Sequence, residues 1–411
     1  MTAQFLAGAA KIDITPTDLS KTYLAGFGQN RKADRVLDPL YARAVYISDG
    51  STEFALVAID LIGLMFEDAW AMRAASGVMA PENVWICCTH THAGPDTFGI
   101  WGPTPIEGVP LLSGMNTEYM KDITRAVGHV VRRAKKRARP AEARFGVDKA
   151  PKDRETWNVR NALLMDHDLS VMHLVRSGNG DSTIATLTNF ASHPECLWEH
   201  NHGVSGDFVS PFNDLMEQML GGVSIFVNGA LGGMVTPGIN EFEPYSDRLR
   251  YYRMYGKSLA RKAIEAVKSA KPAHKAVLRL KEIPFELKLR NDQLGFMFNM
   301  GVLNRRIDGI PDSTAEVWPN VHTSVGILSL GPARFIAVPG ECLPELGLQI
   351  KKMVGGDPCF FLGLCNDELG YLLPESYFAD PEYHYEQSMS PGPHTEGEIK
   401  RMIEAVVSAA D

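Results

Sequence analysis

Six short apolar runs in this chain each stop at, or just before, a residue that can take part in chemistry. They are rich in Val, Ile, Leu and Phe, a length and composition that predict buried β-strands. The runs are 54–59 before Asp60, 84–88 before 89–92, 184–191 before 192–193, 223–227 before Asn228, 334–338 before 339–341, and 359–364 before Asn366. Because ligands in α/β folds bind outside the carboxyl ends of such strands, the reactive groups are expected on one rim.

Helical periodicity lies between these runs. Apolar residues recur at helical spacing over 119–130 and 259–267, and Thr395 and Glu398 form a predicted capping box that starts a C-terminal helix reaching to 409. Alternating strands and helices predict an α/β fold with a mixed central β-sheet flanked by helices. No repeat or long linker divides the chain, so residues 1–411 are expected to form a single domain, and 270–300 is the best candidate for a subdomain boundary.

Composition excludes several classes of protein. The formal net charge of -8 argues against nucleic acid or an anionic membrane as a partner. The basic run 132–139 is interpreted as the solvated end of a helix. No apolar run reaches membrane-spanning length and no secretory signal precedes Lys11. The six cysteines show no Cys-x-x-Cys spacing, so we expect reduced thiols and a cytoplasmic protein.

Two histidines follow the predicted strand 84–88. His90 and His92 are two residues apart, which places both rings on one side of an extended strand end. One is a candidate metal ligand and the other a proton relay, although the pair is also compatible with ordinary polar residues. His193, followed by a proline, ends another strand in the same way. Glu341 is the candidate carboxylate ligand; the alternative is a glutamate that stabilises the start of a following helix.

Several segments together resemble the neutral, non-lysosomal ceramidase family. They occur in the family's order and span most of the chain: 8–16, 38–45, 89–95 (THTHAGP), 192–194, 233–237 and 339–341. The resemblance implies a zinc amidase in which Zn²⁺ is held by His90, His193, Glu341 and Tyr371. The family's later Tyr-Glu pair resembles Tyr385-Glu386.

The same resemblance implies further catalytic residues. His92 matches the histidine beside the metal and is expected to act as a general acid and base, and Arg160 matches an active-site arginine or is an ordinary surface arginine. Thr236 stands where the family has serine, so a hydroxyl that can bind substrate or water is retained. Met234 stands where the family has an acidic residue. The family's full-length members resemble a secreted catalytic domain followed by a β-sandwich, and this chain resembles a short form without either extra part.

The expected mechanism is attack on an amide carbonyl by zinc-activated water, with Tyr371 helping to stabilise the oxyanion. Phe98 and Trp101 follow the histidine pair and are expected to line an apolar substrate pocket, or else only to pack their loop. Gly233, in a glycine-rich turn, either presents a backbone amide to the substrate or only forms a tight turn. His200 and His202 are a candidate second metal pair or a solvated loop.

Three hypotheses on function therefore remain. The first is an amidase acting on an N-acylated small molecule or lipid-like substrate. The second is a zinc-dependent esterase or lactonase, because the same nucleophile attacks either carbonyl. The third is a non-catalytic zinc-binding protein of the same fold.

Overall fold

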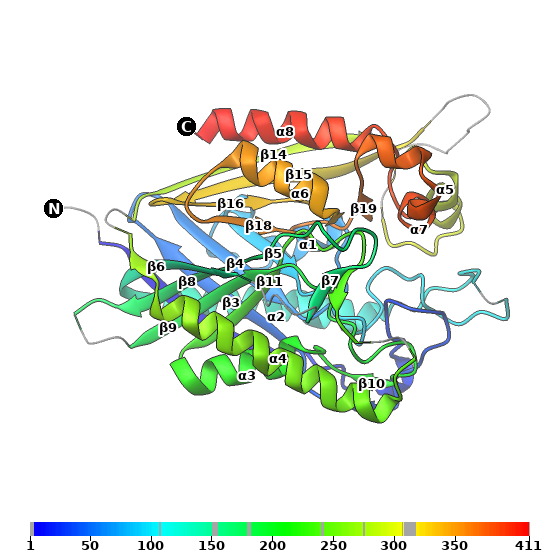
Figure 1. The fold of residues 1–411 in the computed structure, drawn as a ribbon, viewed down its shortest axis with the longest axis horizontal. Helices are drawn as coiled ribbons and strands as arrows, with labels where there is room; N and C mark the ends of the chain where they lie inside the picture. Colours follow the sequence, from blue (N-terminus) through cyan, green and yellow to red (C-terminus); the bar gives the residue numbers. More distant parts are fainter. Residues whose placement is uncertain are drawn as a thin grey trace.

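The protein is described from a computed structural model over residues 4–106, 108–149, 155–178, 182–239, 242–273, 276–305, 307 and 318–410. Two β-sheets lie face to face between two layers of helices, as Figure 1 shows. The predicted α/β fold with a mixed sheet flanked by helices is confirmed, and a second sheet is added to it.

The larger sheet has nine strands within the described residues, in the order β11-β9-β8-β6-β1-β3-β4-β5, with β13 paired to β6. Its pairs are antiparallel except for β11–β9 and β4–β5. The strands are β1 (Leu6–Asp13), β3 (Tyr41–Ser48), β4 (Glu53–Ile59), β5 (Val84–Cys88), β6 (Arg139–Lys149), β8 (Asp168–Arg176), β9 (Thr183–Phe190), β11 (Val223–Asn228) and β13 (Lys271–Pro272). The predicted runs 54–59, 84–88, 184–191 and 223–227 thus fall on strands of this sheet.

The smaller sheet has the order β14-β15-β16-β18, with β16 and β18 parallel. Its strands are β14 (Leu278–Lys288), β15 (Asn320–Leu330), β16 (Ala333–Ala337) and β18 (Cys359–Leu362). Phe335 and Phe360 stack with their ring centroids 4.3 Å apart and meet Phe145 of the larger sheet. The predicted runs near 334 and 359 are buried strands because they lie between this shared core and a helix layer.

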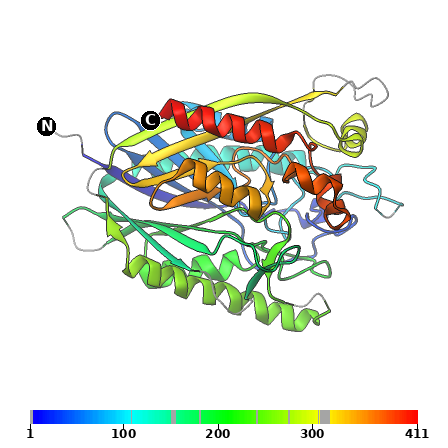
Figure 2. The ribbon, with the colours of Figure 1, turned by 45° about the horizontal axis from the view of Figure 1, so that its top comes forward.

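Helices cover the outer faces of both sheets. Helices α2, α3 and α4 pack on the larger sheet, and α6 and α8 pack on the smaller one, so that α4 and α8 lie on opposite sides in Figures 1 and 2. The helices are α1 (Phe66–Ala74), α2 (Thr117–Lys136), α3 (Val209–Leu220), α4 (Tyr245–Lys268), α5 (Asp292–Asn299), α6 (Pro344–Val354), α7 (His384–Ser388) and α8 (Thr395–Ala410). None of the described helices is both long and apolar enough to cross a membrane.

Three two-stranded pairs complete the described strands. They are β2 (Arg35–Val36) with β10 (Gly203–Val204), β7 (Thr156–Asn158) with β12 (Val235–Pro237), and β17 (Glu341–Cys342) with β19 (Tyr371–Leu372). The β7, β19, α5 and α7 labels gather at the right-hand end of Figure 1. This is the end where the loops after the parallel strands carry the predicted site.

The C-terminal helix begins where it was predicted, but not by the predicted mechanism. Thr395 is already helical and fully buried, and its hydroxyl donates to the carbonyl oxygen of Gly392 at 2.6 Å. The backbone amide of Glu398 bonds to the His394 carbonyl instead of a side chain. The predicted capping box is therefore wrong, because a turn through 392–395 satisfies the threonine hydroxyl.

The smaller sheet begins with β14, inside the segment 270–300 that was the best candidate for a boundary. Its inner face, however, shares one apolar cluster with the larger sheet. Trp85 of β5 packs so closely on Gly326 of β15 that a Cβ there would lie 2.5 Å from the indole ring. On this shared core we propose that residues 1–411 form a single folding unit.

A buried ion pair joins the two sheets and provides a test of that proposal. Arg73 of α1 is fully buried and binds Glu282 of β14 through two contacts of 3.0 and 2.6 Å. The same carboxylate accepts from the Trp85 indole nitrogen at 3.2 Å.

We expect Arg73→Ala to lower the free energy of unfolding by about 3–5 kcal/mol, because it leaves the Glu282 carboxylate buried without its cation. Lys281→Ala, at an exposed neighbour on the same strand, is the matched control and should change stability by less than about 0.5 kcal/mol. Urea unfolding monitored by tryptophan fluorescence measures both. Equal stabilities for the two variants would contradict a structural role for this pair.

Candidate metal centre

His90 lies in the tight turn that follows β5. Its backbone has φ 68°, an uncommon conformation for a non-glycine residue that is held here by a hydrogen bond from its amide to Leu61. The ring Nδ1 lies 2.6 Å from the carbonyl oxygen of Ile62. Because a carbonyl only accepts, Nδ1 carries the proton and Nε2 keeps a free lone pair.

His193 is positioned in the same way after β9. Its Nδ1 is 2.9 Å from the carbonyl oxygen of Val235, and its backbone amide donates to the same oxygen at 2.8 Å. The ring is completely buried, and its Nε2 lies 3.1 Å from an oxygen of Glu341. Two histidines from different strands therefore direct their Nε2 atoms to one place.

Glu341 reaches this place from the smaller sheet. It begins the short strand β17, which pairs in parallel with β19 and sets Glu341 opposite Tyr371. The same carboxylate oxygen lies 3.4 Å from Nε2 of His90 and 3.1 Å from Nε2 of His193. Helix α6 begins only at Pro344, so the alternative role for Glu341 as a stabiliser of the helix start is wrong.

The charges in the cluster follow from burial and from close contact. Burial alone would raise the pKa of Glu341, but His90 and His193 outweigh it and hold that pKa well below its usual range. Burial would likewise lower the pKa of His193, but Glu195 and Glu341 raise it to about 9. In the metal-free protein, the positive charge of protonated His193 balances the negative charge of Glu341. A bound metal cation would supply that positive charge instead.

His92 lies beside this cluster. The ligand atoms of His90, His92 and His193 all lie within 4.8 Å of one another. Both ring nitrogens of His92 are buried without a hydrogen-bond partner in the described residues. Burial, reinforced by the other two histidines, lowers its pKa well below the usual value, so the ring is neutral near pH 7.

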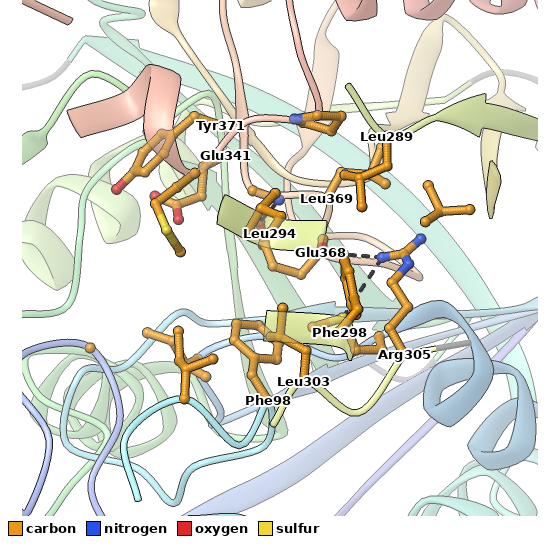
Figure 3. A pocket seen from close by; sticks show the side chains of 18 of the residues that line it. Phe98, Leu289, Leu294, Phe298, Leu303, Arg305, Glu341, Glu368, Leu369 and Tyr371 are labelled. Atoms are coloured by element: carbon orange, nitrogen blue, oxygen red, sulfur yellow. Dashed lines mark hydrogen bonds between the residues drawn. The ribbon is translucent and has the colours of Figure 1, made fainter. Parts of the chain in front are cut away.

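The donor set fits a metal ion. His90 and His193 each bind a backbone carbonyl through Nδ1, which fixes the ring orientation and leaves Nε2 for coordination. Two imidazoles and one carboxylate are the typical ligands of a catalytic zinc site. Tyr371 is buried next to Glu341, and Figure 3 shows their side chains together at the edge of a cavity. Burial raises the pKa of the Tyr371 phenol well above its usual range, with Glu341 adding to the effect.

Two cavities meet at the cluster. The apolar cavity is lined mainly by aliphatic and aromatic side chains, among them Phe98 and Leu294 (Figure 3) and also Trp101. The wide cavity carries more polar groups, including Arg160, Glu195 and Thr236. Four residues line both cavities, namely Gly26, His92, Tyr371 and Tyr385.

The structure places most predicted residues at this junction. Phe98 and Trp101 line the apolar cavity, whereas Thr236 and Arg160 line the wide one. Arg160 is not an ordinary surface arginine, because it binds the fully buried Glu386 through contacts of 2.7 and 3.2 Å.

Two predictions concern residues that lie away from the site. Gly233 lines neither cavity; it has φ 68°, and a Cβ there would lie 3.3 Å from Leu343. The glycine thus serves a tight turn, and the predicted contact with substrate is not supported. His200 and His202 are exposed and contact Glu199 and the Lys32 carbonyl, as expected for a solvated loop.

Two acidic residues of the site were not predicted. Glu195 follows the His193-Pro194 dipeptide and approaches Nδ1 of His92 to 3.7 Å. Glu368 precedes Tyr371 and lines the apolar cavity, where burial and then Glu341 raise its pKa well above the usual range. Each lies two or three residues from a predicted ligand, and this proximity in sequence could have indicated that it belongs to the site.

Arg305 lines the apolar cavity and was also not predicted. It binds Asp367 through two contacts of 2.8 Å and donates to the Glu368 carbonyl, the latter drawn as a dashed line in Figure 3. Nothing near residue 305 in the sequence indicated this role, because its partner lies more than sixty positions away.

The chain has a neutral ceramidase-like α/β fold. The structure of neutral ceramidase from Pseudomonas aeruginosa superposes with a TM-score of 0.79 at 17% sequence identity, covering 99% of this chain and 75% of that one. A ceramidase complexed with C2 matches with the same TM-score and coverage at 16% identity. No protein-family model matches the chain, and no curated protein sequence does. The predicted family resemblance is thus confirmed at the level of the fold.

We expect purified wild-type protein to hold close to one zinc ion per chain, and His90→Ala and Glu341→Ala to lose it. Each substitution removes one of the proposed ligands, and outer partners cannot compensate for a missing ligand. His200→Ala is the matched control, because His200 is exposed and remote from the cluster. Metal content is measured by mass spectrometry after dialysis. Full retention of zinc by both ligand variants would contradict this site.

Zinc binding should release about one proton per chain near pH 7, because the metal-free protein holds His193 protonated and zinc needs its neutral form. A pKa raised to about 9 means that the competing proton is fully bound below that pH. The apparent affinity should therefore rise about tenfold per pH unit up to about pH 9 and then level off. Calorimetry in buffers of different ionisation enthalpy counts the protons. An affinity that is independent of pH below 9 would contradict this charge assignment.

Proposed function

We propose that this protein is a zinc-dependent amidohydrolase that uses activated water to cleave the amide bond of an N-acylated substrate. The observation that carries the proposal is the convergence of His90, His193 and Glu341, with Tyr371 beside them, at the junction of two cavities. The ceramidase fold supports it, because the two similar structures are named for enzymes that act on the amide of ceramide.

Zn²⁺ is the ion that this nitrogen and oxygen donor set suits best, with His90, His193, Glu341 and Tyr371 as its ligands. Such an ion polarises a carbonyl and lowers the pKa of water toward neutrality. The chain's own residues hold the substrate beside it and move the protons.

His92 is suited to general base and then general acid catalysis. Its ring is neutral near pH 7 and both nitrogens are free of protein partners, so it can accept a proton from water and pass it to the departing amine. Gly26 lies directly beneath the ring, where a Cβ would come within 2.4 Å of Nδ1, and Phe27 packs against it edge to face. These contacts restrict the ring to one orientation.

The residues around His92 complete the site. The Tyr371 phenol stays protonated in the metal-free protein, and its ring lies 5.8 Å from that of Tyr385. Arg160, oriented by Glu386, and the Thr236 hydroxyl line the wide cavity beside them. These groups can donate hydrogen bonds to the substrate carbonyl as charge develops on its oxygen.

The two cavities indicate how the substrate lies. The apolar cavity suits an acyl chain, since its lining is largely aliphatic and aromatic. The scissile amide would then lie at the junction, with its nitrogen side toward the wide cavity. A lipid-like or other N-acyl amide fits this arrangement.

We also propose a cytoplasmic location, which the six free and buried cysteines support.

We expect zinc-replete protein to hydrolyse an N-acyl amide with measurable kcat, and His92→Ala to lower kcat by about 10²–10⁴-fold while retaining zinc. The reason is that this variant removes the proton relay but none of the proposed metal ligands. The assay uses a dodecanoyl amide and its matched dodecanoyl ester, with product amine or alcohol quantified by mass spectrometry and His202→Ala as the control.

Preferred turnover of the ester would favour an esterase or lactonase. Zinc-replete wild type that cleaves neither substrate would favour a non-catalytic zinc protein of this fold. Equal activities of wild type and His92→Ala would leave zinc-dependent hydrolysis standing but would remove His92 from the mechanism.

A further inference from the structure

Glu195 is a buried carboxylate that points into the wide cavity without a partner of its own. Glu195 is only 5% exposed, and it lines the wide cavity beside the junction of the two cavities. Within the described residues its carboxylate approaches Nδ1 of His92 to 3.7 Å, beyond hydrogen-bond distance, and no backbone amide donates to it.

The cations around Glu195 bind other groups, and one of them, His193, whose charge Glu195 also favours, is hydrogen-bonded to Glu341 at 3.1 Å. Arg160, which lines the same cavity, is paired through two contacts with the buried Glu386. Arg31 lies behind His92 and donates to the backbone carbonyls of Ala25, at 2.6 Å, and of His92. Arg248 lies over the Trp198 ring and donates to the Cys196 carbonyl at 3.0 Å. None of these guanidinium groups is in hydrogen-bond contact with Glu195.

A buried carboxylate with no bound cation or donor is costly, and a ligand that supplies both relieves that cost. The residue lies on the wide-cavity side of the junction, where the nitrogen side of the amide would extend if the acyl chain fills the apolar cavity. Phe27, Trp157 and Trp198 line the same cavity and can cover the carbon atoms between an amide and a distal charged group.

We propose that Glu195 is a specificity-determining residue that binds a positively charged ammonium group on the amine portion of the substrate. This inference rests on the proposed amide hydrolysis. It narrows the substrate class to N-acyl diamines and related N-acyl compounds that carry a free cationic nitrogen a few bonds beyond the scissile amide.

The competing explanation is that Glu195 only orients His92. The two can be separated, because Glu195→Gln keeps a hydrogen-bond acceptor near His92 but removes the negative charge. A purely orienting role predicts the same fold-change for every substrate, whereas ammonium recognition predicts a larger loss on the charged substrate than on the neutral one.

The test compares N-dodecanoyl-ethylenediamine with N-dodecanoyl-ethanolamine, which differ in an ammonium and a hydroxyl group at the same position. We expect wild type to prefer the charged amide by about tenfold or more in kcat/KM, as for a charge-assisted hydrogen bond. Glu195→Gln should abolish this preference, so that kcat/KM falls about tenfold more on the charged amide than on the neutral one. Glu199→Gln, an exposed glutamate of the same segment, carries the same charge change and should keep the preference.

The affinities of both amides for metal-free protein are measured by calorimetry as a second readout that needs no turnover. Wild type that treats the two amides alike, or a Glu195→Gln variant that is slowed equally on both, would overturn the inference while leaving amide hydrolysis intact. If zinc-replete protein cleaves neither amide, the proposed function fails. In that case a Glu195-dependent binding preference for the charged amide still supports the inference, and its absence overturns it.

Discussion

The contact between Glu341 and the two histidines is the constraint on which the site depends. His90 and His193 follow strands of the larger sheet, whereas Glu341 follows a strand of the smaller one. Neither sheet holds a complete donor set, so the centre forms only where the sheets pack face to face. The ionised carboxylate and the protonated imidazole are both buried, and a metal cation bound there would take the place of the proton.

The treatment of buried charge distinguishes structural from functional groups in this protein. Several buried carboxylates are matched by an arginine, as in the pairs Arg43–Asp60, Arg73–Glu282, Arg160–Glu386 and Arg305–Asp367. Three of these pairs connect segments more than sixty positions apart, and two of them, those of Arg160 and Arg305, lie at the walls of the cavities. Glu195 has no such partner among the described residues, which is why it indicates a ligand and not a structural role.

The strands and the rim of reactive groups could be predicted because both depend on local pattern. Short apolar runs such as 84–88 and 184–191 fall on strands since they are largely buried on both faces, and His90 and His193 follow these two runs within two residues. The capping box at Thr395 was wrong for a related reason. A local motif specifies a cap only if its hydroxyl is free, and here the preceding turn uses that hydroxyl.

By itself the sequence determined the strand-forming runs, the candidate ligands His90, His193 and Glu341, and the resemblance that the fold then confirmed. Tertiary structure alone decided that these runs divide between two stacked sheets, that two cavities meet at His92, and that Arg305 and Glu195 belong to the site. The physical reason is the distance along the chain over which each interaction acts. Hydrophobic periodicity and turn chemistry act over a few residues, whereas the packing of one sheet on another and the pairing of buried charges join positions more than a hundred residues apart.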